Sequence, residues 1–236
     1  MSETGIKQNG ILFFVPPEYT SAIDPITGFC NLFDWDSVKN IRRLLASFRR
    51  ISYNVKKDWF EFEWNYQDVL QYTRLEQCAN PQTWVACTFS ERIEWTGSKQ
   101  YRNRKCENIA LTAKFKALFE KYEIEYLSGA NLKDALNSIN KKDDIKELKR
   151  LFFLTLSLRN KPDQDTDYIL SPIQDASGTF FDSRKVDKDA TPKLPNNGDA
   201  NGAYNIARKG LLALNKLKDG INEQISLGEW IQFVKS

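Results

Sequence analysis

Apolar and polar residues follow one another in blocks whose period changes several times along the chain. The short run at 11–15 is continuously apolar and ends at two prolines, which predicts a strand buried on both faces. Residues 59–64 alternate strictly, with Phe60, Phe62 and Trp64 on one side and glutamates on the other. This period of two predicts a strand that pairs with residues 51–55 in a hairpin.

Helical spacing dominates the middle and the end of the chain. Amphipathic helices are predicted over 38–48, 111–122, 132–139, 145–158 and 200–218, followed by a last short helix around Trp230 and Phe233. For the helix over 200–218, the predicted buried face consists of Ile206, Gly210, Leu214 and Leu217. Between the helices, a strand is predicted over 84–93, a basic loop over 97–105, and a hairpin from 167–172 and 180–184.

Composition narrows the class of protein. The chain has 236 residues, 41% of them hydrophobic, which is typical of a globular protein with a sizeable core. Its 34 basic and 31 acidic residues leave a net charge of +3, so a nucleic-acid partner has to be sought in local patches. No apolar run approaches the roughly 20 residues of a membrane span, and the N-terminus is not a signal peptide. We therefore expect a soluble, cytoplasmic protein without a membrane partner.

The residue types that are missing limit the chemistry further. The chain contains no histidine, which excludes histidine bases, histidine metal ligands and Ser-His-Asp or Cys-His catalysis. Its four cysteines are widely scattered, which argues against a zinc site and a disulfide framework. Catalysis would have to use Asp, Glu, Lys, Arg, Tyr or Ser, and carboxylates suit hard cations, above all Mg²⁺.

The segment 198–204, Gly-Asp-Ala-Asn-Gly-Ala-Tyr, combines one carboxylate with small residues at the start of a predicted helix. Small side chains leave room for a metal ion and a phosphate backbone, which is typical of a metal-holding aspartate in a nuclease. Asp199 also suits a plain helix N-cap, and its position alone favours that interpretation over metal binding.

A second candidate region is rich in basic and aromatic residues. Basic side chains interleaved with Trp95 and Tyr101 suit single-stranded nucleic acid, although a solvated charged loop is the commoner explanation. The candidate residues for nucleic-acid binding in this region are Arg92, Lys99, Arg102, Arg104 and Lys105. Arg184, in the predicted hairpin at 180–184, is a further candidate for contact with backbone phosphates, although a structural role is the favoured interpretation there.

Several segments in a shared order resemble the C-terminal end of the type V-A CRISPR RNA-guided DNA endonucleases, the Cpf-type effectors. The matching segments are 10–16 (GILFFVP), 20–21 (TS), 23–25 (IDP), 27–29 (TGF), 60–62 (FEF), 158–160 (LRN), 167–168 (DY), 171–172 (SP), 181–184 (FDSR) and 199–204 (DANGAY). The resemblance implies an α+β fold in three parts. Residues 1–16 end a RuvC segment as a strand, residues 17–198 form a Nuc domain of helices and antiparallel strands, and residues 199–236 form the terminal RuvC segment. The flanking parts would be partial elements of an RNase H-like domain.

The resemblance also implies roles for three residues. Asp199 matches a RuvC acid and is expected to be a catalytic Mg²⁺ ligand. Arg159 matches a Nuc arginine that serves in cutting the target strand, where a guanidinium suits a phosphate; a helix C-terminal arginine is the alternative. Asp167 is expected to orient Arg159 or to lie near the scissile strand, or else to be a plain strand-edge aspartate. The sequence departs from the family pattern at Asn197-Gly198 and at Lys161.

By the same resemblance, the partners are a crRNA guide, target DNA and the remaining RuvC segments of the effector. The other RuvC acids match no position here, and a two-metal centre needs three or four carboxylates. We therefore expect Met1 to be an internal methionine of a longer chain and the isolated polypeptide to be inactive. The alternatives are a non-catalytic module that binds single-stranded DNA and a remnant without function.

Overall fold

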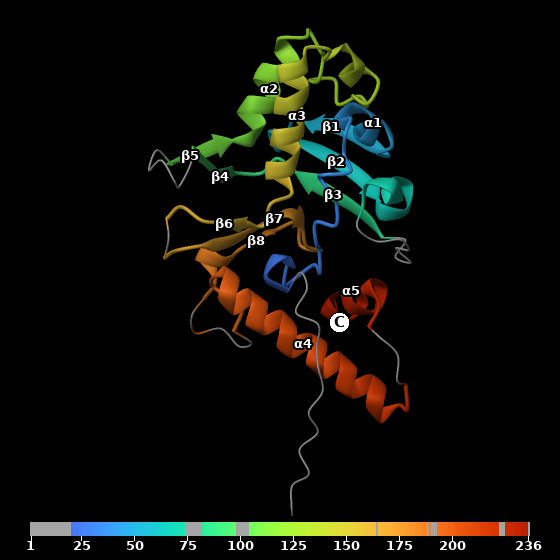
Figure 1. Ribbon diagram of the computed structural model, residues 1–236, viewed down its shortest axis with the longest axis vertical. Helices are drawn as coiled ribbons and strands as arrows, with labels where there is room; N and C mark the ends of the chain where they lie inside the picture. Colours follow the sequence, from blue (N-terminus) through green and yellow to red (C-terminus); the bar gives the residue numbers. More distant parts are fainter. Residues whose placement is uncertain are drawn as a thin grey trace, which may run out of the picture.

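The computed structural model describes residues 20–73, 82–97, 104–163, 165–187, 189, 193–221 and 225–235. Helices and antiparallel strands lie in separate parts of the molecule, which confirms the predicted α+β class. Figure 1 shows two helices above one part of a sheet, further strands of the same sheet below that part, and a long helix that crosses beneath them.

The main sheet is antiparallel throughout and joins residues far apart in the sequence. Its strands, in the order β1-β2-β3-β7-β6 with β8 paired to β7, are β1 (Arg50–Asn54), β2 (Trp59–Asn65), β3 (Thr83–Cys87), β7 (Tyr168–Gln174), β6 (Arg159–Asn160) and β8 (Phe180–Asp182). The predicted hairpin is confirmed, with Ile51 opposite Phe62. Ala86 lies opposite Ile173, so one register position joins the first half of the chain to the segment that follows Asp167.

The predicted strand over 84–93 is wrong, because the chain breaks it into two. The segment β3 ends at Cys87, and a separate hairpin begins with β4 (Glu91–Thr96) and returns as β5 (Lys105–Ala110). Thr88 leaves the ladder and donates its backbone N–H to Phe60, whose own N–H is bonded to the Thr88 hydroxyl. Ser90 then adopts a φ of 64°, a left-handed conformation outside the β region, so regular strand geometry ends before this residue.

Two helices cover one face of the sheet: α2 (Leu111–Glu120) and α3 (Lys142–Thr155). They bury aromatic rings against β2: the centroids of Phe62 and Phe152 lie 5.1 Å apart, and those of Phe60 and Phe119 5.0 Å apart. Both were predicted from spacing. The predicted helix at 38–48 shortens to α1 (Ile41–Ala46), and that at 132–139 to one 3-10 turn, η3 (Ala135–Ser138). Further 3-10 turns are η1 (Thr20–Ala22), η2 (Tyr66–Tyr72) and η4 (Ser183–Lys185).

The chain closes with the long helix α4 (Gly198–Lys218) and the short helix α5 (Leu227–Lys235), both predicted. The predicted buried face of α4 is wrong. Ile206 and Leu217 are 38% and 45% exposed, whereas Asn201 and Asn205 are fully buried.

The reason is a set of amide hydrogen bonds that dock α4 on the segment around η1. The Asn201 side-chain amide donates to the carbonyls of Ser21 and Ile23 at 3.1 and 2.8 Å, and that of Asn205 donates to Thr20 at 2.9 Å. Gly202 lies on the same face, where a Cβ would sit 3.6 Å from the Ser21 side chain. Asparagines therefore dock the first part of α4 on the segment around η1, while Leu212, further along the helix, is partly buried against the hydrophobic core. Within the described residues, no helix has the length and apolarity needed to cross a membrane.

Candidate functional site

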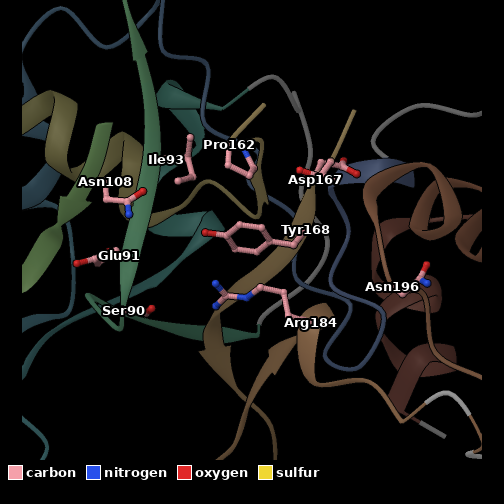
Figure 2. Close-up of a pocket in the computed structure, with 10 residues that line it drawn as sticks. Ser90, Glu91, Ile93, Asn108, Pro162, Asp167, Tyr168, Arg184 and Asn196 are labelled. Atoms are coloured by element: carbon pink, nitrogen blue, oxygen red, sulfur yellow. The ribbon is translucent and has the colours of Figure 1, made fainter. Parts of the chain in front are cut away.

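A cavity of about 450 Å³ opens between the β4–β5 hairpin, the start of β7 and the segment that leads into α4. Figure 2 shows Tyr168 and Arg184 in the middle, with Glu91 and Asn108 on one side and Asn196 on the other. Asp167 lies in its wall. The cavity therefore adjoins the place where the two segments of the resemblance, at 167 and at 199, meet.

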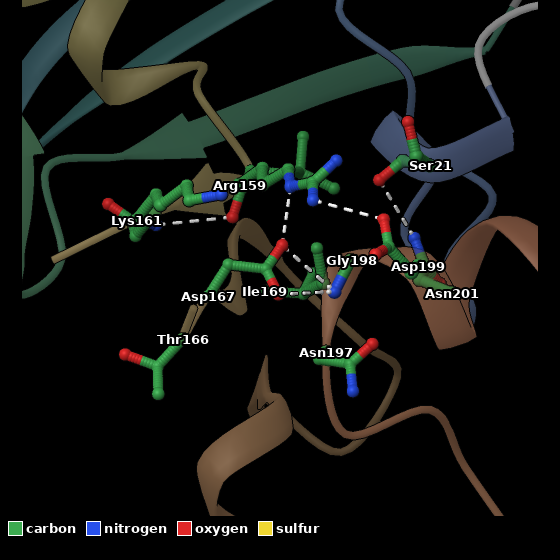
Figure 3. A network of polar contacts seen from close by, with 12 residues as sticks. Ser21, Arg159, Lys161, Thr166, Asp167, Ile169, Asn197, Gly198, Asp199 and Asn201 are labelled. Carbon is green, nitrogen blue, oxygen red and sulfur yellow. Dashed lines mark hydrogen bonds and ion pairs between the residues drawn. The ribbon is translucent and has the colours of Figure 1, made fainter. Parts of the chain in front are cut away.

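Three predicted residues from separate parts of the chain converge beside this cavity (Figure 3). The Arg159 Nε donates to Asp167 Oδ2 in a very short contact, and its Nη2 donates to Asp199 Oδ1 at 3.1 Å. Arg159 comes from β6, Asp167 precedes β7, and Asp199 belongs to the first turn of α4. One guanidinium thus bridges two carboxylates, an arrangement to which its forked donors are suited.

Burial differs sharply across this network. The Asp167 side chain is 9% exposed and that of Arg159 37%, whereas the Asp199 side chain is 92% exposed. Asp167 also accepts the backbone N–H of Gly198, with both carboxylate oxygens at 3.1 Å. Of the two carboxylates that Arg159 bridges, Asp167 is therefore the structural one and Asp199 is the one that faces solvent.

Asp199 is not the N-cap of α4. Asn197 holds that place with extended backbone angles, and its side-chain oxygen accepts the backbone N–H of Ala200 at 2.8 Å. An aspartate in the first turn is favoured by the helix dipole, but its carboxylate has no capping bond to make here. The N-cap interpretation of Asp199 is therefore wrong, and its carboxylate remains available to a ligand on its exposed side.

Arg159 does not end a helix either. The helix α3 stops at Thr155, and Arg159 opens the short strand β6, opposite Ile169 of β7. The backbone N–H of Leu170 donates to the Leu158 carbonyl at 2.8 Å, so pairing to β7 begins just before Arg159. The alternative of an arginine at a helix C-terminus is wrong, because strand pairing sets the place of this side chain.

The basic candidates separate into different environments. Arg92 is fully buried, and its Nη1 donates to the Phe89 carbonyl at 3.0 Å, so the expectation that it lies in an exposed basic region is wrong. Its place in β4 turns it inward, and burial lowers its pKa to about 10.

Arg104 and Lys105 are exposed at the start of β5, and the Arg104 guanidinium carbon lies 4.4 Å from the centroid of the Trp95 ring. Arg184 stacks on Tyr168 at 4.1 Å and forms two 2.8 Å hydrogen bonds with Asp182. Lys99, Arg102 and Tyr101 lie outside the described residues, as does the predicted strand at 11–15. Among the described residues, Arg104 thus forms a basic-aromatic pair with Trp95.

A magnesium ion finds only part of a site among these side chains. Asp199 is an exposed, acceptor-only ligand of the kind that Mg²⁺ prefers. In the described ranges, however, no group of three or more His, Cys, Asp or Glu side chains is placed to hold a metal ion. The described residues can therefore supply one ligand to a magnesium ion, but they do not form a complete two-metal centre.

A protein-family model described as NUC, nuclease domain, matches residues 23–185. The match covers more than half of the chain, so the chain belongs to this family. Its general chemistry is accordingly that of a nuclease, a hydrolase acting on nucleic acid. Arg159 and Asp167 lie inside the matched residues, and Asp199 lies beyond them.

Sequence reasoning missed several residues that shape the site. Asn197 caps α4, Gly198 donates to Asp167, and Asn201 with Asn205 docks the helix. The i,i+4 spacing of the two asparagines on one helix face was a usable signal. No local pattern pointed to Gly198, because its role depends on a carboxylate from another segment.

Proposed function

We propose that this nuclease domain is part of an RNA-guided DNA endonuclease and presents a DNA strand for cleavage at Arg159 beside Asp199. The observation that carries the proposal is the bridge from Arg159 to Asp167 and Asp199, made by residues the resemblance had assigned to the site. Guide pairing would specify the sequence, and the protein would act on the backbone.

In this proposal each residue of the bridge has a separate task. Asp167 is a positioning residue, because it is nearly buried and holds Arg159 by its Nε. Arg159 keeps a partly exposed guanidinium that can bind a backbone phosphate. Asp199 contributes one exposed carboxylate to a magnesium centre whose other ligands come from further RuvC segments. Bound Mg²⁺ supplies an activated water and stabilises the leaving oxygen.

The test is a cleavage assay in two settings. The purified chain with Mg²⁺ and single-stranded DNA is expected to bind the DNA without cutting it. The same chain assembled with the remaining RuvC segments, a crRNA and target DNA is expected to cut, and Asp199→Asn is expected to abolish cutting. Cleavage by the isolated chain that Asp199→Asn removes would overturn the incomplete centre.

A non-catalytic module that binds single-stranded DNA is the second candidate. The stack of the exposed Arg104 on the half-buried Trp95 favours it, because such pairs bind bases and phosphates without sequence preference. Salt-sensitive binding in both settings, with cleavage in neither, would assign this function instead.

A further inference from the structure

The cavity beside the Arg159 bridge is lined for a flat molecule with hydrogen-bonding edges. Its volume of about 450 Å³ lies within the roughly 300–1,000 Å³ of small-ligand sites. The Tyr168 ring and the Arg184 guanidinium stack at 4.1 Å in the middle of the cavity, and the amide side chains of Asn108 and Asn196 lie on opposite sides of it (Figure 2). Aromatic rings and guanidinium planes are the surfaces on which proteins stack unpaired bases, and amides read base edges.

The stacking surface is held in place before any ligand arrives. Arg184 donates from Nε and Nη2 to the two oxygens of Asp182, each at 2.8 Å, which fixes the guanidinium plane. Burial raises the pKa of Asp182, but the bonds from Arg184 lower it more, so the carboxylate stays charged. The Arg184 side chain is nonetheless 49% exposed, so the fixed guanidinium remains accessible. A fixed platform reduces the ordering cost of binding.

The charges around the cavity favour a base over a phosphate inside it. Glu91 and Asp167 both line the cavity and would repel a phosphate placed within it. The buried Arg92 lies close enough to Tyr168 and Arg184 for their charges to affect its pKa. Its Nε and Nη2 have no hydrogen-bond partner among the described residues, and the nearby Asp182 carboxylate, which acts to raise the pKa of Arg92, is already paired with Arg184. Positive potential near the cavity and carboxylates in its wall suit a neutral base attached to an anionic backbone.

We propose that this cavity binds one unpaired base of a single-stranded nucleic acid, stacked at Tyr168 and Arg184 with its edge toward Asn108 and Asn196. The inference rests on the proposed function, because it deepens the account of the same site. Asp167 both lines the cavity and holds Arg159, so the backbone of a strand whose base enters the cavity passes the bridge. Seating the base then places a neighbouring phosphate near Arg159.

The test measures binding, so it does not depend on cleavage. Fluorescence anisotropy would compare the chain's affinity for short single-stranded oligonucleotides, each carrying one abasic position in turn. Loss of a stacked base is expected to weaken binding roughly 5- to 100-fold at one position. Tyr168→Ala should remove this position dependence and Tyr168→Phe should keep it. The matched control is Tyr204→Ala, since Tyr204 also pairs with an arginine, at 5.4 Å, but does not line the cavity.

Asn196→Phe guards against a variant that fails to fold, because Asn196 is exposed and a ring there would fill the cavity. It should also abolish the position dependence while its thermal melt remains cooperative. Equal binding of intact and abasic strands at every position overturns the base site and leaves the proposed nuclease function standing. Free deoxynucleoside monophosphates are the remaining competitor. If they abolish the position dependence at concentrations that leave overall strand binding intact, the cavity binds a free nucleotide and the base site is also overturned. If no strand binds at all, both proposals fall.

Discussion

The backbone of Gly198 lies against the carboxylate of Asp167, and the two residues are in contact because position 198 has no side chain. The Gly198 N–H donates to both Asp167 oxygens at 3.1 Å. A Cβ at this position would overlap Asp167 Oδ2 and lie 2.8 Å from Arg159 Cζ, closer than real Cβ atoms come to their neighbours. The start of α4 therefore closes on the Arg159–Asp167 pair only with glycine at position 198.

Gly198→Ala tests this close approach. The methyl group is expected to displace Asp167 and Arg159 and to destabilise the fold by about 1–3 kcal/mol, as overpacking does. Urea unfolding measures the effect. Gly202→Ala in the same helix is the matched control, because its Cβ would meet the Ser21 side chain at an ordinary 3.6 Å. A loss for Gly198→Ala no larger than the control's would show that the contact is loose.

Arg159 variants separate the charge of the bridge from its forked geometry. Arg159→Gln removes one cation, so the slope of log affinity against log salt should fall by roughly 0.7 for single-stranded DNA. Arg159→Lys keeps the charge and should keep the slope, but an ammonium has no planar fork for bidentate contacts. The Arg159→Lys variant should therefore bind DNA more weakly than the wild type, with the same salt dependence. If the salt-dependence slope is the same for the wild type and both variants, Arg159 does not contact a phosphate.

Asn201→Ala tests the docking of α4. The substitution leaves the carbonyls of Ser21 and Ile23 without the 3.1 and 2.8 Å bonds from this amide. Because the site is fully buried, the expected loss is about 1–3 kcal/mol in the free energy of unfolding. Asn215→Ala, at an exposed position of the same helix, is the control and should be neutral or slightly stabilising. Equal effects of both variants would contradict docking by Asn201.

The contact between α4 and α5 should depend on pH. Lys216 Nζ donates to Glu229 Oε1 at 2.7 Å, and this bond, followed by those from Ser226, lowers the pKa of Glu229 from 4.5 to about 2. A depressed carboxyl pKa contributes stability that is present above pH 4.5 and is lost as the pH falls toward 2.

The stability difference between the wild type and Glu229→Gln measures this contribution. This difference should be constant from neutral pH to about 4.5 and should fall toward zero as the pH drops from 4.5 to 2. Since the Glu229 side chain is 42% exposed, added salt should reduce the difference. A difference that does not change across this acid range would exclude the ion pair as its source.

Local patterns determined much of the architecture. The alternation at 59–64 predicted β2, and the spacing of apolar residues predicted α2 and α3, because a strand or helix is built from bonds and burial with a short, regular period. The same patterns located the start of a helix near Asp199. These patterns failed where local and tertiary preferences competed. The break at Thr88–Ser90 and the buried asparagines of α4 both depend on hydrogen bonds to residues far away in the sequence.

The sequence by itself therefore determined the α+β class, most of the elements and, through a family resemblance, the residues to examine. Only the tertiary structure decided that Arg159, Asp167 and Asp199 meet, because β6 must pair with β7 and α4 must dock on the segment around η1 before they can. It alone turned Arg92 into the interior and left Asp199 exposed. Contacts between distant segments depend on how whole elements pack, and no short stretch of residues encodes that packing.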